Sequence, residues 1–463
     1  MPKIPLEFAP GSFPSFDEAV IDGKVAARFY DGFEDEAGAK YKRPGFTTFS
    51  TSAIETPVQG IFWSEFLACF IAVGNGKLYK VTTGGVVSAI TGATLDNHNP
   101  ARFTENGTVV YVTTGGPMFT TNGTTASQVP DASAPVLTTH LGWNDGHILV
   151  NQANSQFFWW ADVGTGIWDP NNSESPNADI DKLKALGVGW REILLIGTRS
   201  TEFWYNTGET PGTYQRIEGA YIERGISAPY SLILDDNTWF WLDQERNFIR
   251  LEGRNPKIVS VPVHTILSGL ADVSDLVTSR FQYLNRRFIL LSSRANNISL
   301  LYDITKDAWY QWGIWNESTS DYDQWPVHSV AYSTSTNTYV TLNNDGYMYT
   351  LGGNASDARF SLRSAHISHG TYNWKLCLSL TLRLKRGYLT TDPVSVLRVR
   401  WRDDGEQTWG NWHSIPLNDL GEYTNVANLW RCGRYRTRQY EFMQSDANPF
   451  ALVNVVEDVE PVE

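Results

Sequence analysis

The chain has few cysteines and no long apolar run. Its 463 residues include three cysteines, Cys69, Cys377 and Cys432, which cannot all pair and do not have the spacing of metal ligands. A reduced compartment is therefore favoured over a secreted disulfide scaffold. The first residues, Met1-Pro2-Lys3-Ile4-Pro5, lack the apolar core of a signal peptide, and no apolar run is long enough to span a membrane. We therefore expect a soluble protein that is not exported by that route.

Charged residues and helix-forming blocks are also scarce. Only 19% of the residues are charged, whereas 13% are aromatic and tryptophan occurs 18 times. Disordered chains have the opposite composition, so the chain is expected to fold around a large core. Small turn residues are abundant and Ala/Leu/Glu/Lys blocks are rare, which predicts a nearly all-β protein. Short helices are expected only over 176–186 and 261–277.

Motifs for catalysis and ligand binding are absent as well. The sequence has no Gly-x-Ser-x-Gly elbow, and Gly74-Asn75-Gly76-Lys77-Leu78 lacks the Ser/Thr and the helix that a phosphate-binding loop needs. His366 and His369 are three residues apart, but no cysteine or pair of acids follows nearby to complete a metal site. We therefore predict a protein that is not an enzyme and has no catalytic residue, cofactor or metal.

A repeated pattern is clearest from Arg280 to Gly313. Four short apolar runs are separated there by polar turns, which is typical of a four-stranded antiparallel meander. Asp303 lies six residues before Trp309 in this segment. Asp162 and Trp168 have the same spacing. We interpret both pairs as one device, in which the Asp binds backbone amides of a tight hairpin and the Trp covers the sheet.

Similar units run from residue 59 to residue 352. Seven of them average 42 residues each, which matches the roughly 40–50 residues of known propeller repeats. This pattern predicts a β-propeller with seven candidate blades, or six because two units are weak, in which tryptophan and tyrosine fill the spaces between blades. Residues 1–58 are expected to form an N-terminal arm that lends a closing strand to the propeller.

The pattern changes after Gly353. Residues 353–450 contain strands that alternate apolar and polar residues, which predicts a β-sandwich-like module, and 451–463 are interpreted as an acidic tail. The formal charge is −13 for 1–360, +4 for 361–450 and −4 for the tail. An acidic propeller argues against tight wrapping of nucleic acid, whereas the basic module is expected to face an acidic partner. The candidate contacts with such a partner are Arg383, Arg386, Arg398, Arg400, Arg431, Arg434 and Arg436.

Three segments resemble one family of phage proteins. Gly187-Val188-Gly189-Trp190-Arg191-Glu192-Ile193-Leu194-Leu195-Ile196-Gly197, followed by Ser200-Thr201-Glu202-Phe203-Trp204, is similar to the central signature of the packaged-DNA stabilisation proteins. These are the tail accessory, or nozzle, proteins of short-tailed bacteriophages. Tyr221-Ile222-Glu223-Arg224-Gly225-Ile226 is similar to the segment that follows, and Trp430-Arg431-Cys432-Gly433-Arg434-Tyr435-Arg436 to the C-terminal module. The order and spacing fit over residues 45–456.

The resemblance implies a structural virion protein, made in the host cytoplasm, that forms a hexameric ring below the portal and its adaptor. The ring extends the DNA channel, retains the packaged genome and docks a tail needle, spikes or fibres. The implied partners are therefore other copies of the chain, portal and adaptor proteins, the distal tail proteins, and DNA that passes without sequence-specific binding. No enzymatic activity, cofactor or small-molecule substrate is implied. Reversing Arg434 and Arg436 to Glu is expected to block ring assembly.

Two other functions remain open. One is a glycan- or receptor-binding propeller that uses exposed Trp312, Trp315 and Trp325. The other is a glycosidase, because 403–409 resembles the Asp-box turn of sialidases and other propellers, although Arg402 and Glu406 replace its usual Ser and Gly. That turn is structural where it occurs, and sialidase chemistry would also need an arginine triad and a tyrosine nucleophile.

Overall fold

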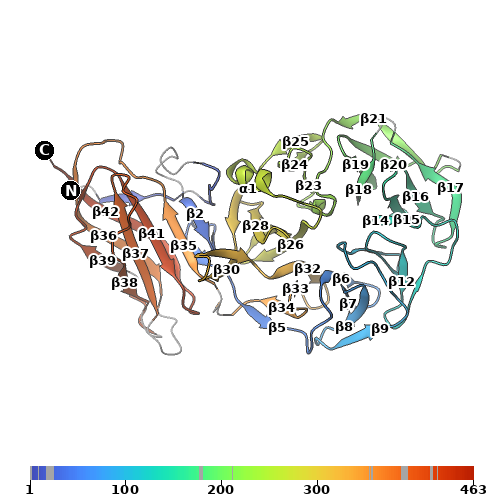
Figure 1. The fold of residues 1–463 in the computed structure, drawn as a ribbon, viewed down its shortest axis with the longest axis horizontal. Coiled ribbons are helices and arrows are strands. Elements are labelled where there is room, and N and C mark those ends of the chain that lie inside the picture. Colours follow the sequence, from blue (N-terminus) through green and yellow to red (C-terminus); the bar gives the residue numbers. More distant parts are fainter. Residues whose placement is uncertain are drawn as a thin grey trace.

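The computed structural model describes residues 3–8, 10–16, 26–176, 181–210, 212–353, 355, 358–386, 395–417, 421–424 and 426–462. Its regular elements are almost all strands, arranged as a ring of sheets beside a module of two larger sheets (Figure 1). The predicted all-β fold, a propeller followed by a sandwich-like module, is confirmed. No helix among the described residues is long and apolar enough to cross a membrane.

Six four-stranded antiparallel sheets stand by themselves in the ring. The first three are β6 (Val58–Ser64), β7 (Cys69–Gly74), β8 (Lys77–Val81) and β9 (Val87–Ile90); β10 (Arg102–Glu105), β11 (Val110–Thr113), β12 (Phe119–Thr121) and β13 (Ala126–Gln128); and β14 (Thr138–Asn144), β15 (His147–Gln152), β16 (Phe158–Ala161) and β17 (Trp168–Glu174).

The next two are β18 (Leu183–Gly189), β19 (Glu192–Gly197), β20 (Thr201–Asn206) and β21 (Tyr214–Ile222); and β22 (Ile233–Asp235), β23 (Thr238–Leu242), β24 (Phe248–Glu252) and β25 (Asn255–Ile258). The last sheet joins β32 (Val327–Ser333), β33 (Thr338–Asn343) and β34 (Met348–Leu351) to β5 (Phe46–Thr48), which comes from the N-terminal region. This pairing of β5 with β34 ties the beginning of the chain to the end of the ring.

A further four-stranded meander fills the remaining place in the ring. It consists of β26 (Val277–Tyr283), β27 (Arg286–Ser293), β28 (Ile298–Asp303) and β29 (Ala308–Gln311), and it is the segment in which the repeat is clearest in the sequence. Unlike the other six sheets it is not isolated, because β29 pairs with β2 (Ala26–Tyr30) and so continues into the C-terminal module.

The second strand of a blade is buried on both faces. All six residues of β7 and all five of β23 are buried. Both read as continuous apolar or aromatic runs rather than alternating ones, because a neighbouring blade packs on each side. Outer strands such as β25 are mostly exposed. The aromatic residues fill the spaces between blades as expected: the rings of Trp160 and Tyr214, from adjacent blades, lie 5.0 Å apart.

The C-terminal module is a sandwich of two sheets over one core. One sheet contains β3 (Gly32–Glu34), β4 (Lys40–Lys42), β42 (Ala451–Pro461), β36 (Lys375–Lys385) and β39 (Val426–Trp430), with β1 (Lys3–Leu6) on β42 and β40 (Arg434–Tyr435) on β36. The other continues from β29 through β2, β35 (Phe360–Ser364), β41 (Arg438–Gln444) and β37 (Val396–Asp403) to β38 (His413–Pro416). The hairpin of β30 (Gly313–Asn316) and β31 (Asp321–Gln324) lies between propeller and sandwich (Figure 1).

The predicted acidic tail over 451–463 is wrong. Residues 451–461 form β42, a central strand that pairs with β36, β4 and β1. The acids of this segment do not indicate a solvated tail, because Glu457 is fully buried. Glu457 accepts hydrogen bonds from the hydroxyls of Tyr435 and Tyr440 and lies 2.6 Å from His369 Nε2. Burial alone would raise the pKa of Glu457, but the hydrogen bonds from His369 and Tyr440 outweigh it and lower this pKa.

The N-terminal arm is not a single element either. Of its described strands, β5 completes a blade, whereas β1, β2, β3 and β4 belong to the sandwich. The two parts are held together by a fully buried ion pair, in which Arg43 Nε lies 2.8 Å from Asp31 Oδ1. Asp31 also accepts hydrogen bonds from the amides of Gly313 and Arg359, so one carboxylate joins the arm, the β30–β31 hairpin and the start of the sandwich.

The proposed Asp–Trp device is present once and not twice. Asp303 Oδ1 accepts hydrogen bonds from the amides of Thr305 (2.9 Å) and Lys306 (3.2 Å), and Trp309 is buried. In the other hairpin Trp168 is buried, but Asp162 is exposed and its carboxylate binds the Asn172 side chain. The two Asp residues therefore have the same spacing but different hydrogen bonds. The Asp303 carboxylate also forms an ion pair with the buried Arg286.

One of the two expected helices is present. Residues 261–269 form the 3-10 turn η2 (Val261–Val263) and α1 (His264–Gly269). The helix predicted over 176–186 is wrong from Leu183 onward, where β18 begins, and 177–180 lie outside the described residues. Leu183 and Ala185 point into the core between blades, and this packing decides for a strand despite the helix-favouring composition.

Candidate interaction surface

The predicted contact arginines lie in three different environments. Arg386 is buried, and its guanidinium donates to the carbonyls of Pro416 (2.7 Å) and Val426 (3.2 Å), so its position in a contact surface is wrong. These bonds join the end of β36 to β38 in the other sheet and to β39 in its own sheet. Arg383 is exposed on the outer side of β36, in the sheet that contains β42.

The outer side of the other sheet carries a cluster of arginine and tryptophan. Three guanidinium groups lie over the Trp409 ring, those of Arg402 at 4.8 Å, Arg400 at 4.9 Å and Arg363 at 5.3 Å. Arg400 also lies 4.1 Å from the Trp412 ring. Glu441, on the strand between them, forms ion pairs with both Arg363 and Arg400. Cation–π contacts of this kind orient the guanidinium groups at a partly solvated surface.

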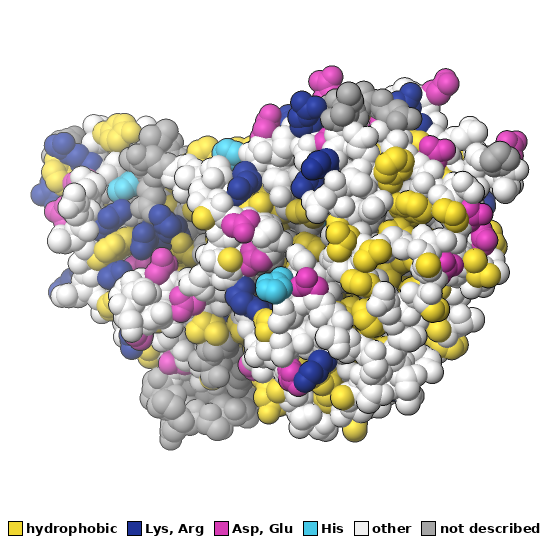
Figure 2. All heavy atoms as spheres, turned by 45° about the vertical axis from the view of Figure 1, so that its right-hand side comes forward, with side chains coloured by type: hydrophobic (Ala, Val, Ile, Leu, Met, Phe, Trp, Pro, Cys, Tyr) yellow, Lys and Arg dark blue, Asp and Glu magenta, His cyan; other side chains and the backbone are white. Residues whose placement is uncertain are grey.

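The cluster continues to a cavity beside the propeller. Arg398 and Arg359 line this cavity of about 470 Å3, together with Trp315 and Glu317. The Arg359 guanidinium lies 3.7 Å from the Trp315 ring. We call this surface the arginine face, and it comprises Arg359, Arg363, Arg398, Arg400 and Arg402 with Trp315, Trp409 and Trp412. Figure 2 shows the concentration of Lys and Arg side chains on the sandwich.

The last three predicted arginines form a separate group. Arg434 and Arg436 lie over the half-exposed Trp374, at 5.8 and 4.7 Å from its ring, and Arg431 is exposed nearby in sequence. The Arg436 amide donates to Asp404 Oδ1 at 2.8 Å, as does the Thr437 amide at 2.9 Å. Asp404, in the segment that resembles an Asp box, is therefore a structural turn residue.

Several residues of this surface were not predicted. Arg363 and Trp409 are far apart in the sequence, and their meeting depends on the pairing of β35 with β41. Arg438 belongs to the same basic segment as Arg436 but is fully buried, where it forms an ion pair with Asp403 at 2.6 Å. All seven residues of β41 are buried, and Arg438 is the first of them, whereas Arg434 and Arg436 precede this covered strand. The net charge of +4 over 361–450 is cancelled by the four acids of 451–463. The module as a whole is therefore neutral, and the positive charge is concentrated on one face.

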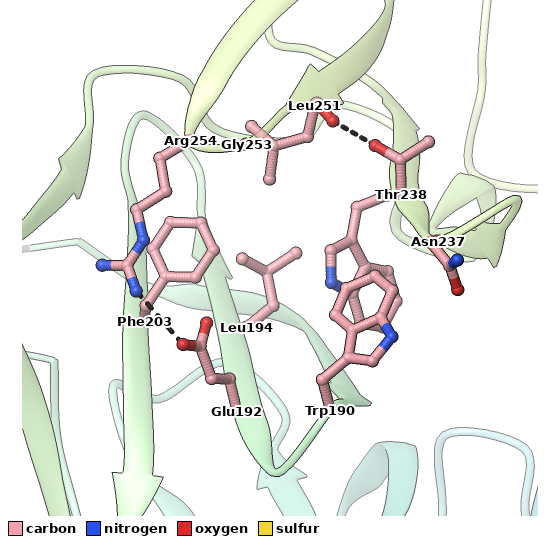
Figure 3. Close-up of a pocket in the computed structure, with 10 residues that line it drawn as sticks. Trp190, Glu192, Leu194, Phe203, Asn237, Thr238, Leu251, Gly253 and Arg254 are labelled. Carbon is pink, nitrogen blue, oxygen red and sulfur yellow. Dashed lines mark hydrogen bonds and ion pairs between the residues drawn. The ribbon is translucent and has the colours of Figure 1, made fainter.

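The tryptophans expected to be exposed for glycan binding are not. Trp312 and Trp325 are completely buried, and Trp315 is covered by Arg359. An exposed tryptophan lies instead between two blades, where Trp190 borders a cavity of about 470 Å3 (Figure 3). Arg254 forms the opposite side of this cavity, over the Phe203 ring at 4.8 Å and 3.2 Å from Glu192.

The centre of the propeller contains buried titratable groups. Arg102 of β10 donates to the Tyr230 carbonyl at 2.6 Å in the 3-10 turn η1 (Pro229–Ser231), which precedes β22. His140 Nε2 of β14 lies 3.0 Å from the Pro229 carbonyl. Two blades lie between η1 and β10, and one lies between η1 and β14, so these contacts reach across the centre of the ring. Burial and the nearby charge of Arg102 lower the pKa of His140 to about 3, and burial with Arg294 lowers that of His328 to about 4.

Acidification is expected to destabilise the propeller through these two histidines. Both stay neutral in the folded protein, whereas in the unfolded chain they take up protons below pH ~6.5. Their contribution to stability is therefore full above pH ~6.5 and is lost as the pH falls, by about 2 kcal/mol per histidine at pH 5. Urea unfolding of wild type and of a His140→Gln/His328→Gln variant at pH 7.5 and 5 measures this. The wild type should lose about 4 kcal/mol more than the variant, and parallel losses would contradict the assignment.

Among the described residues, no group of three or more His, Cys, Asp or Glu side chains is arranged to hold a metal ion. The three cysteines are buried and are not joined in disulfides.

Comparison with known proteins identifies a family. Residues 32–356 match the family model described as Bacteriophage P22 Gp10, beta-propeller. A search of curated proteins finds no significant match. Among solved structures, the N-terminal domain of Nup159 is similar with 10% identity and a TM-score of 0.41, covering 71% of this chain and 99% of that one.

Two further structures have similar values. Streptogramin B lyase has 10% identity and a TM-score of 0.41, covering 67% of this chain and 98% of its own. BamB from Moraxella catarrhalis has 10% identity and a TM-score of 0.39, covering 69% and 92%. The family match spans more than half of the chain, and it includes the propeller signature around Trp190 and the arm from β3 onward. The chain therefore belongs to the Bacteriophage P22 Gp10 beta-propeller family, and it is a structural phage protein with a propeller fold.

Proposed function

We propose that this chain is a subunit of a short phage tail that assembles into a ring below the portal and its adaptor. The ring extends the DNA channel, retains the packaged genome and docks distal tail proteins. Membership of the Bacteriophage P22 Gp10 family is the observation that carries this proposal. The family is a structural one, which is consistent with a chain without enzymatic activity.

Two physical features support a channel formed between copies rather than through one propeller. Arg102 and Tyr230 are hydrogen-bonded across the centre of the propeller, which leaves this axis unsuited to a DNA duplex. Residues 1–360 carry a net charge of −13. An acidic wall repels the phosphate backbone and lets DNA slide without adhering. A basic lining in the assembled ring would contradict this account.

Native mass spectrometry and negative-stain imaging, with and without portal or adaptor rings, test the assembly. Six copies around an open channel are expected. A monomer that ignores those rings would contradict the proposal and favour the alternative, a glycan- or receptor-binding propeller, for which the cavity beside Trp190 is the candidate site. A glycan array tests that alternative directly, and fluorogenic substrates test for a glycosidase.

Reversing Arg434 and Arg436 to Glu is expected to prevent ring assembly without unfolding the monomer. Both side chains are exposed over Trp374, so the folded chain does not depend on their charge. Reversal places carboxylates where an acidic partner surface would approach, and such like-charge contacts cost several kcal/mol. Imaging counts the rings, and circular dichroism checks the fold. Normal ring numbers would remove these residues from the interface.

A further inference from the structure

The arginine face has an excess of positive charge over its own acids. Glu441 pairs with two of its five arginines and Glu317 lines the cavity. Asp404 and Glu406 are exposed in the turn between Arg402 and Trp409. The faces of the tryptophan rings are covered by guanidinium groups, for example those of Trp409 and Trp315. Guanidinium groups suit carboxylates and phosphates alike, but covered rings are poorly placed to stack on nucleic-acid bases. The chemistry therefore favours an acidic protein surface as the partner.

An acidic surface of this kind exists on the chain itself. Strands β17 and β21 are the outer strands of two adjacent blades. Together with the turns that precede them and Glu223, which follows β21, they occupy 162–174 and 207–223. These two stretches carry six acids and one basic residue, Arg216. We call them the acidic edge, and its acids are Asp162, Asp169, Glu174, Glu209, Glu218 and Glu223.

The two charged surfaces lie at opposite ends of the molecule. Figure 1 shows β17 at the end of the propeller farthest from the sandwich and β21 along the top of the ring. In Figure 2 the Lys and Arg side chains gather over the sandwich, whereas Asp and Glu side chains are scattered over the molecule, some of them at the opposite margin of the propeller. Because they are so far apart, the two surfaces cannot neutralise one another within one copy.

We propose that the arginine face of one copy binds the acidic edge of the next copy. The contact joins different surfaces of identical chains, so it is heterologous, and repeated contacts close into a ring when the rotation between copies permits. This inference rests on the proposed ring and names the surfaces that form it. Since the contact depends on exposed charges, its strength falls as the salt concentration rises.

A charge-exchange experiment tests the pairing. One variant carries Arg398→Glu and Arg402→Glu on the arginine face, and a second carries Glu218→Arg and Glu223→Arg on the acidic edge. Each variant alone places like charges against one another, and its self-association should weaken by about a hundredfold. In an equimolar mixture the two variants can alternate, so that each contact joins either two reversed surfaces or two unchanged ones. Every contact is then again between opposite charges, and association should return. Analytical ultracentrifugation measures association, and imaging shows whether the assemblies are closed.

The outcomes separate this pairing from the proposed function. Lys385→Glu, an exposed basic residue on β36 of the other sheet, is the matched control and should associate like wild type. Recovery in the mixture supports the pairing even if the assemblies are open filaments, which would contradict the ring alone. If the wild type forms rings but each variant associates as strongly as the wild type, the pairing is overturned and the ring is not. The same holds if the variants are impaired and mixing them does not restore association. A wild-type chain that does not associate under any condition would overturn both.

Discussion

Replacing Asp303 with alanine is expected to destabilise the propeller by about 4 kcal/mol, because the change leaves a buried charge without its partner. Asp303 Oδ2 accepts from Arg286 Nε at 3.0 Å and forms an ion pair with the same guanidinium, and both side chains are completely buried. Asp303 Oδ1 holds the hairpin through the amides of Thr305 and Lys306. Within the described part of the chain Arg286 Nη1 already lacks a hydrogen-bond partner, so Arg286 cannot easily find a substitute.

The matched control is Asp162→Ala, at the same place in another blade. Its carboxylate is exposed and binds Asn172, so a loss within about 0.5 kcal/mol is expected. Urea unfolding followed by tryptophan fluorescence measures both variants. The double variant Asp303→Ala/Arg286→Met should recover part of the loss, because it removes the uncompensated charge. Equal losses for Asp303→Ala and Asp162→Ala would show that the buried ion pair does not stabilise the blade.

Replacing Glu457 with alanine is expected to destabilise the sandwich by about 4 kcal/mol. The change removes the common acceptor for Tyr435, Tyr440 and His369, and it leaves two buried hydroxyl groups to find other partners. These groups come from β40, β41 and the loop before β36, so the carboxylate links both sheets of the module. Glu457→Gln keeps the shape but weakens charge-assisted bonds, and an intermediate loss is expected.

Hydrogen exchange measures this loss in the sandwich separately from the propeller. Protection should fall in β36, β41 and β42 and stay unchanged in blades such as β18–β21. Glu460→Ala provides the control, because Glu460 lies on the same strand but is half-exposed, and its effect should stay within about 0.5 kcal/mol. Equal protection in wild type and Glu457→Ala would mean that the hydrogen-bond network contributes little to the stability of the module.

The blades were predictable because their signals are local. Each of them consists of short apolar runs separated by turn residues, and such runs differ from helices by their length and by the residues at their ends. The meander from β26 to β29 follows its predicted turns closely. The helix expected over 176–186 shows the limit of local signals, because burial of Leu183 and Ala185 between blades outweighed a helix-favouring composition.

The candidate surface was predictable only in part. Alternation along β37 correctly places Arg398 and Arg400 on its outer side, away from the buried Leu397 and Val399. The same kind of reasoning did not distinguish Arg386 from the exposed arginines. Arg386 is buried at a strand end and donates hydrogen bonds to backbone carbonyls. It also did not reveal Arg363, which joins the arginine face through a strand that is distant in sequence.

The sequence by itself determined the all-β class, the repeated four-stranded units and the order of propeller and sandwich, because periodicity and turn chemistry act between neighbouring residues. Tertiary structure alone decided that β1 to β4 and β42 complete the sandwich, that Glu457 and Arg438 are buried, and where positive charge gathers. Strand pairing joins residues hundreds of positions apart, such as Lys3 with Asp458. Partners at that distance are selected by the packing of whole sheets, which no local pattern specifies.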